Sequence, residues 1–153
     1  MTLAIGQTLP SFTAQSTGGA MRSEDHAGKT LLLYFYPKDS TPGCTTESQN
    51  FRDHHDAFAK AGAMIFGISR DSLKSHAKFK ADLELPFELI SDPDEVLCAA
   101  FDVMKMKNMY GKPVRGVDRS TFVIAANGIL AREWRGVKVA GHVEEVLEYV
   151  KSL

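Results

Sequence analysis

A cysteine at the start of a predicted helix is the residue of this chain that most clearly suggests chemistry. Residues 41–44 read Thr-Pro-Gly-Cys, so Thr41 is the expected N-cap and the proline takes the first helical position, where it is favoured. Cys44 then lies in the first turn, where free N–H groups and the helix dipole stabilise a thiolate, the nucleophilic form of cysteine. Gly43 lets a small substrate approach the backbone, and the Thr41 hydroxyl can hydrogen-bond the sulfur or the substrate. From spacing alone, a capped helix with an inert cysteine explains the segment equally well.

The elements around Cys44 are predicted to form a βαβ unit. Residues 31–36 and 63–68 are short apolar runs typical of strands that are covered on both faces. Between them a helix is expected from about residue 42 to residue 61, followed by Gly62 as its stop signal. Two strands joined through a helix are expected to be parallel. Cys44 therefore follows the carboxyl end of a strand, where active sites collect in such sheets.

The second half of the chain adds shorter elements. Asp71 is expected to cap a helix over residues 72–83, and residues 87–90 to form a strand. Asp92 and Pro93 are expected to open a third helix, with Asp92 as N-cap and Glu95 completing a variant of the capping box. That helix carries Cys98.

A hairpin and a last helix are expected near the C-terminus. Asn127 and Gly128 separate the strand-like residues 121–125 and 129–134, which is a strong hairpin signal. A helix is expected from about residue 142 to residue 150. The sum is an α/β fold, with a mixed sheet and helices on both faces.

Composition limits the function. The 153 residues fit one domain, residues 1–153, and 44% of them are apolar, which is enough for a core. A net charge of −1 argues against a nucleic-acid partner, and the basic residues between 105 and 115 are expected to lie in a flexible loop. There is no apolar run of transmembrane length, and the first six residues do not read as a signal peptide, so a cytoplasmic protein is expected.

Several blocks resemble a known family. Pro37, Thr41 and Cys44 match the pattern Pro-x-x-x-Thr-x-x-Cys of the peroxiredoxins, and residues 34–47 as a whole resemble their Q subgroup, also called bacterioferritin comigratory proteins. Residues 6–12, 67–72, 108–112 and 119–124 are similar to further blocks, so the likeness covers nearly the whole chain. One departure is that residues 9–12 read Leu-Pro-Ser-Phe where Ala-Pro-Asp-Phe is usual.

The resemblance implies a thioredoxin-like fold and a peroxidase for hydrogen peroxide and organic hydroperoxides. Cys44 is then the peroxidatic cysteine, which becomes a sulfenic acid, and Thr41 is the hydroxyl that polarises the peroxide. Arg119 is the guanidinium that stabilises the thiolate and binds a peroxide oxygen. Pro37 shields the thiolate, and Glu47, about one helical turn after Cys44, orients Arg119.

The second cysteine does not stand where the family often places a resolving cysteine. Position 49, five residues after Cys44, is Gln49, and residues 74–83 contain no cysteine. Cys98 lies in a short apolar helical segment and reads as a buried hydrophobic residue. We therefore expect a one-cysteine cycle, in which thioredoxin, or glutaredoxin with glutathione, reduces the sulfenic acid directly. The alternatives are a two-cysteine cycle in which Cys98 resolves, and a redox sensor or holdase without efficient turnover.

Other functions have weaker support. A disulfide oxidoreductase on this fold normally uses Cys-x-x-Cys, and its second cysteine is replaced by Glu47. Residues 53–56, Asp-His-His-Asp, point in different directions on a helix, so they are not expected to bind one metal ion. No metal and no cofactor is expected. The subgroup resemblance favours a monomer, with a dimer as the alternative.

Overall fold

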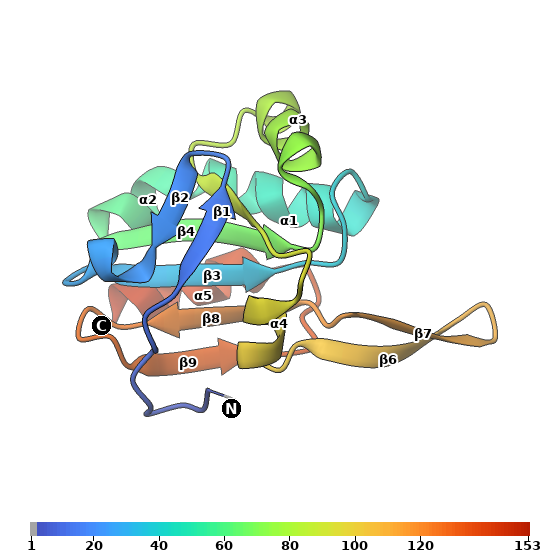
Figure 1. Cartoon of the computed structure of the whole chain (residues 1–153). Coiled ribbons are helices and arrows are strands. Elements are labelled where there is room, and N and C mark those ends of the chain that lie inside the picture. The colour runs from blue at the N-terminus through green and yellow to red at the C-terminus, as the bar shows by residue number, and fades with distance from the viewer. Residues whose placement is uncertain (1–2) are drawn as a thin grey trace.

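A seven-stranded mixed sheet forms the centre of the structure (Figure 1). The structure is a computed structural model that describes residues 3–153, and for Met109 it describes the backbone alone. In sheet order its strands are β2 (Gly19–Arg22), β1 (Thr13–Ser16), β5 (Glu88–Ser91), β4 (Ala63–Ser69), β3 (Thr30–Phe35), β8 (Ser120–Ile124) and β9 (Leu130–Trp134). Strands β3, β4 and β5 are parallel to one another, and β1 and β8 run antiparallel to their neighbours in this group. The predicted βαβ unit is therefore confirmed.

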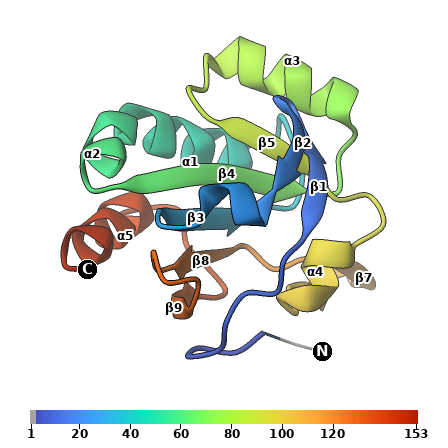
Figure 2. The ribbon, with the colours of Figure 1, turned by 60° about the vertical axis from the view of Figure 1, so that its left-hand side comes forward.

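Helices cover both faces of the sheet (Figure 2). One face packs against α1 (Pro42–Asp53), α2 (His55–Lys60), α3 (Leu73–Leu83) and α5 (His142–Lys151), and the other against α4 (Val96–Ala100) and the N-terminal segment. A short 3-10 helix, η1 (Ser23–His26), follows β2. None of the described helices has the length and apolar character that a membrane span requires.

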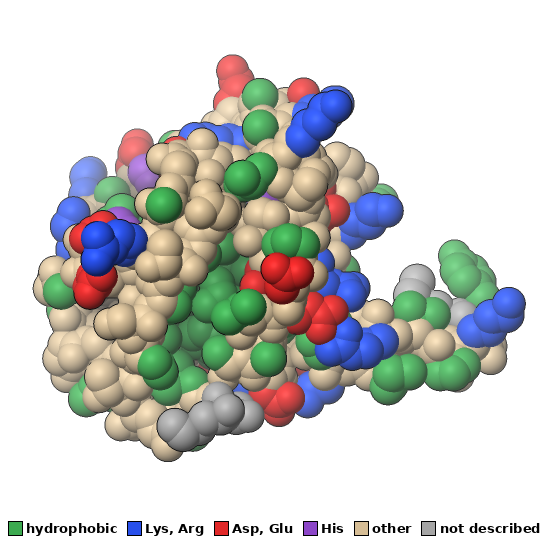
Figure 3. Space-filling model, in the orientation of Figure 1, with side chains coloured by type: hydrophobic (Ala, Val, Ile, Leu, Met, Phe, Trp, Pro, Cys, Tyr) green, Lys and Arg blue, Asp and Glu red, His purple; other side chains and the backbone are tan. Residues whose placement is uncertain are grey.

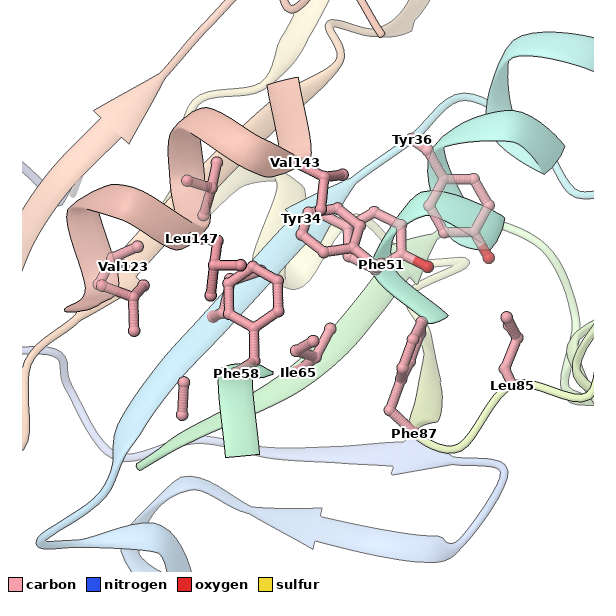
Figure 4. Close-up of a cluster of buried hydrophobic side chains, with 14 of the residues drawn as sticks. Tyr34, Tyr36, Phe51, Phe58, Ile65, Leu85, Phe87, Val123, Val143 and Leu147 are labelled. Carbon is pink, nitrogen blue, oxygen red and sulfur yellow. The ribbon is translucent and has the colours of Figure 1, made fainter. Parts of the chain in front are cut away.

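The sheet separates two hydrophobic cores, because neighbouring residues of a strand point to opposite faces. On β3 and just after it, Leu32, Tyr34 and Tyr36 belong to the core beneath α1 and α5, where Tyr34 stacks on Phe51 at 4.6 Å (Figure 4). Leu31, Leu33 and Phe35 belong to the core on the other face, beneath α4. Burying an aromatic or branched side chain contributes about 2 kcal/mol, so the two cores hold the sheet from both sides.

The C-terminal elements agree with the sequence. Strands β8 and β9 form an antiparallel hairpin, and Gly128 in its turn has a φ of 85°, a conformation that costs glycine least. Helix α5 spans His142–Lys151 as expected.

Four local predictions were wrong, and two of them concern the helices that flank β4. The helix expected to reach residue 61 is broken at His54 into α1 and α2. Helix α3 is capped by Ser72, whose hydroxyl accepts from the Ser75 N–H, and the Asp71 carboxylate instead accepts from the Asp39 N–H and the Ser69 hydroxyl. The Asp71 carboxylate thus binds one donor that is distant in the sequence, Asp39, and one that is close, Ser69, and the cap of the helix falls to Ser72.

Helix α4 also starts later than expected. It begins at Val96 with Glu95 as the flanking residue, so Pro93 is not its first helical residue. The Asp92 carboxylate still satisfies this end of the helix, because it accepts from the N–H groups of Leu97 and Cys98.

The expected flexible loop between residues 105 and 115 is a β-hairpin. Strands β6 (Met104–Met109) and β7 (Lys112–Val117) pair antiparallel and form a separate two-stranded sheet that projects from the body of the molecule (Figure 1). The lysines and methionines of this stretch alternate along the strand, a period-2 pattern that the prediction overlooked.

Candidate active site

Cys44 lies in the first turn of α1, at the edge of the sheet where β3 ends. Thr41 has extended backbone angles as the N-cap and Pro42 is the first helical residue, as predicted, so Cys44 occupies the third helical position. Its side chain is 1% exposed and belongs to the core beneath α1. The sulfur therefore lies at the positive end of the α1 dipole, in a site from which bulk water is largely excluded.

A guanidinium contacts the sulfur from the neighbouring strand. Arg119 directly precedes β8, and because Phe35 of β3 pairs with Ser120 of β8, it reaches the same edge of the sheet as Cys44. Its Nη2 group donates to the Cys44 Sγ at 3.5 Å. A Cβ at Gly43 would lie 3.1 Å from that Nη2, so the glycine that the sequence linked to substrate approach also makes room for Arg119.

Glu47 holds the guanidinium from its other side. It lies on α1 about one turn after Cys44, is 0% exposed, and accepts from the Arg119 Nη1 at 2.7 Å. Burial raises the pKa of the Glu47 carboxyl and Arg119 lowers it, with a net value of about 7. Burial lowers the pKa of Arg119, but the nearby Glu47 and Cys44 raise it further, so the guanidinium stays charged. Arg119 is thus a permanent cation between a carboxyl group and a sulfur.

Thr41 and Pro37 lie in the segment that connects β3 to α1. The Thr41 hydroxyl donates its proton to the carbonyl of Lys38 at 2.8 Å, which leaves its lone pairs as acceptors. Pro37 is half-buried in the segment between β3 and α1. The Thr41 side chain does not cap the helix, so its hydroxyl is not committed to the N–H groups around Cys44.

A buried polar network that the sequence did not indicate fixes the segment before Cys44. The Asp39 carboxylate accepts from the Tyr36 hydroxyl at 2.6 Å, the Ser75 hydroxyl at 2.8 Å and His76 Nδ1 at 2.7 Å. Burial raises the pKa of Asp39, but the hydrogen bonds from His76 and Tyr36 lower it more, and the net value is below the ordinary one. The network therefore ties the segment before α1 to helix α3.

The same network contains the cluster that most resembles a metal site. Ligand atoms of Asp39, Asp71 and His76 lie within 4.8 Å of one another. They are already engaged with protein donors and acceptors: His76 Nε2 lies 2.9 Å from the Ile90 carbonyl oxygen, and Asp71 accepts from Ser69 and from the backbone. The polar atoms of this cluster therefore have hydrogen-bond partners within the protein.

Cys98 lies in the other core. It is fully buried beneath α4, on the face of the sheet opposite to Cys44. Burial, and then hydrogen bonding to Asp92, raises the pKa of the Cys98 thiol well above its ordinary value. A protonated, buried thiol is a poor nucleophile. The structure thus does not bring the two sulfurs into one site.

The stability of the folded chain is expected to depend on pH through Glu47. Its carboxyl holds a proton up to about pH 7 in the folded chain, against an ordinary pKa of 4.5. The stability that the raised pKa of Glu47 contributes is fully present below its ordinary pKa. As the pH rises through the pKa of the folded chain, the free energy of unfolding falls by roughly 3 kcal/mol. We expect Glu47→Gln to remove this loss, as measured by the free energy of unfolding in denaturant at about pH 5 and about pH 8.

The comparison with wild type isolates the Glu47 effect. Burial lowers the pKa of His142 to about 4, which changes stability with pH in the opposite direction but equally in both proteins. Equal changes in unfolding free energy between the two pH values in wild type and Glu47→Gln would show that Glu47 does not titrate in this range.

Comparisons with known proteins agree with the resemblance. The AhpC/TSA family model matches residues 5–133. Peroxiredoxin Bcp of Bacillus subtilis is 47% identical, with 100% of this chain and 98% of the relative aligned, and peroxiredoxin Bcp of Xanthomonas campestris is 53% identical over 94% of this chain and 89% of the relative.

Solved structures give the same result. A cysteine-to-serine variant of PrxQ from Xylella fastidiosa superposes with a TM-score of 0.93 at 42% identity, covering 99% of this chain and 98% of the other. The Xanthomonas campestris bacterioferritin comigratory protein superposes with a TM-score of 0.87 at 51% identity, covering 92% and 90%. The chain therefore belongs to the AhpC/TSA family and is a peroxiredoxin of the Q subgroup, a thiol-dependent peroxidase with a thioredoxin-like fold.

Proposed function

We propose that Cys44 is the nucleophile that attacks the peroxide, and that Arg119, Thr41 and Pro37 form its pocket. The observation that carries this proposal is the hydrogen bond from the Arg119 guanidinium to the Cys44 sulfur at the start of α1. A permanent cation and a helix N-terminus at one sulfur favour the thiolate over the thiol. Glu47 positions Arg119 and does not touch the substrate.

The arrangement supports a displacement at oxygen. The thiolate attacks one peroxide oxygen, an S–O bond forms, the O–O bond breaks, and the leaving oxygen takes a proton to give an alcohol or water. Negative charge moves from the sulfur onto the leaving oxygen, and fixed donors aimed at that charge lower the barrier. Arg119 supplies such donors, and the Thr41 hydroxyl can accept the peroxide O–H. Cys44 ends as a sulfenic acid.

The substrates we propose are hydrogen peroxide and organic hydroperoxides. The Xanthomonas campestris bacterioferritin comigratory protein is described by its alkyl peroxide reduction activity. In this chain Cys44 is 1% exposed, so the group beyond the attacked oxygen must extend away from the sulfur toward solvent, and in the proposed pocket it passes Thr41 and Pro37. Small and unbranched hydroperoxides fit that condition.

We further propose a one-cysteine cycle. Cys98 is protonated, fully buried and on the far side of the sheet. The thiol that reduces the sulfenic acid is therefore supplied by another molecule. Thioredoxin, or glutaredoxin with glutathione, would attack the sulfenic sulfur, release water and leave a mixed disulfide, which a second thiol then reduces. Two free cysteines suit a reducing compartment, and we propose a monomeric cytoplasmic enzyme, with a dimer as the alternative.

The intact mass of the oxidised protein tests this cycle. After one equivalent of peroxide, we expect the chain to gain oxygen, and peptide mapping to place that oxygen on Cys44. The Cys98→Ser variant is the matched control and should give the same product, because Cys98 takes no part. Loss of two hydrogen atoms within a monomer would instead show a Cys44–Cys98 disulfide and overturn the one-cysteine cycle.

A further inference from the structure

The β6–β7 hairpin forms a positively charged arm, by which we mean residues 104–117. The arm contains Lys105, Lys107, Lys112 and Arg115 and no acidic residue, although the whole chain has a net charge of −1. Its sheet is separate from the central one, and it projects from the body of the molecule with blue and green side chains along it (Figure 3). The arm is therefore a local excess of positive charge on an otherwise acidic chain.

One end of the arm is fixed to the body. The Arg115 guanidinium donates to both carboxylate oxygens of Glu95, at 2.5 and 2.7 Å, and Glu95 also accepts from Arg70. A bidentate pair of this kind fixes direction as well as distance. The arm is thus held at a defined angle to α4.

The strand register divides the arm into two faces. Lys107 pairs with Val114 and Lys105 with Gly116, so Lys105, Lys107, Lys112 and Val114 share the face opposite to Arg115. We call this the lysine face. Among the described residues, neither Lys107 nor Lys112 pairs with a carboxylate, although the Lys107 ammonium donates to the Val117 carbonyl oxygen. Lys105 lies 3.8 Å from Asp102.

Apolar side chains are exposed along the same arm. Tyr110 at the tip is 99% exposed, Val114 on the lysine face is 42% exposed, and Met106, which pairs with Arg115 on the other face, is 65% exposed. Exposed aromatic and methionine side chains with a cationic border are the composition of a protein-binding surface. Lysines on an open strand edge also prevent aggregation, and this accounts for the charge but not for the exposed Tyr110 and Met106.

The arm leaves the sheet beside the proposed active site. Strand β7 ends at Val117, and Arg119, which contacts the Cys44 sulfur, follows two residues later. Because β8 starts where β3 ends, the segment that leads to Cys44 and the arm extend from the same edge of the sheet (Figure 1). A protein whose thiol reaches Cys44 would lie within reach of the arm.

We infer that the arm, through its lysine face with Val114 and through the exposed Tyr110 at its tip, is the docking surface for a thiol protein whose own surface near the reactive thiol is acidic and partly apolar. This inference rests on the proposed one-cysteine cycle and names its partner as a protein rather than a free small thiol. In the reaction, the partner's thiol attacks the sulfenic sulfur of Cys44 and expels water, and the partner's second thiol then releases Cys44 and forms the partner's disulfide. Cationic side chains at the rim of an interface act mainly on the association rate.

Charge reversal on the arm tests this inference. The test variant is Lys105→Glu/Lys112→Glu, and the matched control is Lys60→Glu/Lys151→Glu, which makes the same charge change at α2 and at the end of α5, away from the arm (Figure 1). Each protein is first oxidised with one equivalent of peroxide and is then reduced, in a stopped-flow instrument, by thioredoxin, by glutaredoxin with glutathione, or by dithiothreitol.

We expect the second-order rate constant with at least one of the two proteins to fall about tenfold in the arm variant at low ionic strength, and its dependence on salt to weaken. The dithiothreitol rate serves as the reference in every variant. Three outcomes would overturn the inference. The arm variant could react with both proteins at the wild-type rate, or the control variant could show an equal fall in rate. Wild type could also react no faster with either protein than with dithiothreitol. Failure of peroxide to oxidise Cys44 is measured before any protein thiol is added, and it would count against the proposed function itself.

Discussion

Replacing Cys44 with serine is expected to reduce peroxide consumption to that of buffer, a loss of at least about a thousandfold. Serine presents a hydroxyl group that stays protonated at neutral pH and that peroxide does not oxidise, so neither the nucleophile nor the sulfenic acid can form. The rest of the pocket is expected to be unchanged, because the serine oxygen is only slightly smaller than the sulfur that it replaces.

Cys98→Ser is the matched control for that loss. It is the same substitution, made at a buried position in the core on the other face of the sheet. We expect this variant to keep most of the activity, while its free energy of unfolding falls by about 1–2 kcal/mol because a hydroxyl is more costly to bury than a thiol.

Peroxide consumption, measured with dithiothreitol and with thioredoxin, checks both variants. Thermal unfolding shows whether each variant is folded at the assay temperature. Comparable activity losses in two folded variants would assign a catalytic part to Cys98, and full activity in Cys44→Ser would remove Cys44 from the reaction.

Features set by neighbouring residues could be predicted from the sequence. The helix that starts at Pro42 and the hairpin at Gly128 each depend on a few consecutive residues whose backbone preferences are strong. The parallel pairing of β3 with β4 follows from the βαβ rule, which needs only the order of the elements. Local preference and element order therefore predicted the position of Cys44 in the fold.

Features set by distant contacts could not be predicted in this way. Asp39 and His76 are separated by 37 positions in the sequence, and only the folded chain shows that they form a buried pair. Asp71 looked like a cap for α3, but the Asp39 N–H and the Ser69 hydroxyl compete for its carboxylate. A carboxylate has several acceptor sites, and the sequence does not say which donors will reach them.

Arg119 illustrates both cases. An isolated arginine gives no indication of what it contacts. Arg119 was expected at the site only because residues 119–124 resemble a family block. Its contact with Cys44, 75 positions away, results from the pairing of β8 with β3 and from the absence of a side chain at Gly43. The geometry therefore gives a physical reason for a role that the sequence indicated only by likeness.

Replacing Arg119 with alanine is expected to slow oxidation of Cys44 by peroxide by about 10²–10³-fold. The variant loses the guanidinium that contacts the Cys44 sulfur, and with it the cation and the donors that the proposed mechanism places at the reacting sulfur and at the leaving oxygen. Arg119→Lys keeps the charge but loses the fork that contacts Cys44 and Glu47 together, so its rate should lie between those of alanine and wild type. The measurement is the rate of sulfenic-acid formation in a single turnover, by competition for peroxide with a reference thiol.

Stability must be separated from chemistry in this experiment, because alanine leaves Glu47 buried without its partner. A lone carboxyl at this position is expected to keep its proton at neutral pH, since burial alone raises its pKa. The double variant Arg119→Ala/Glu47→Gln imitates that neutral state, and it should unfold at a similar denaturant concentration to Arg119→Ala and react with peroxide equally slowly. If Arg119→Ala is folded and its sulfenic acid forms as fast as in wild type, the guanidinium does not act on the reacting sulfur, and its hydrogen bond to Cys44 serves only the packing of α1 against β8.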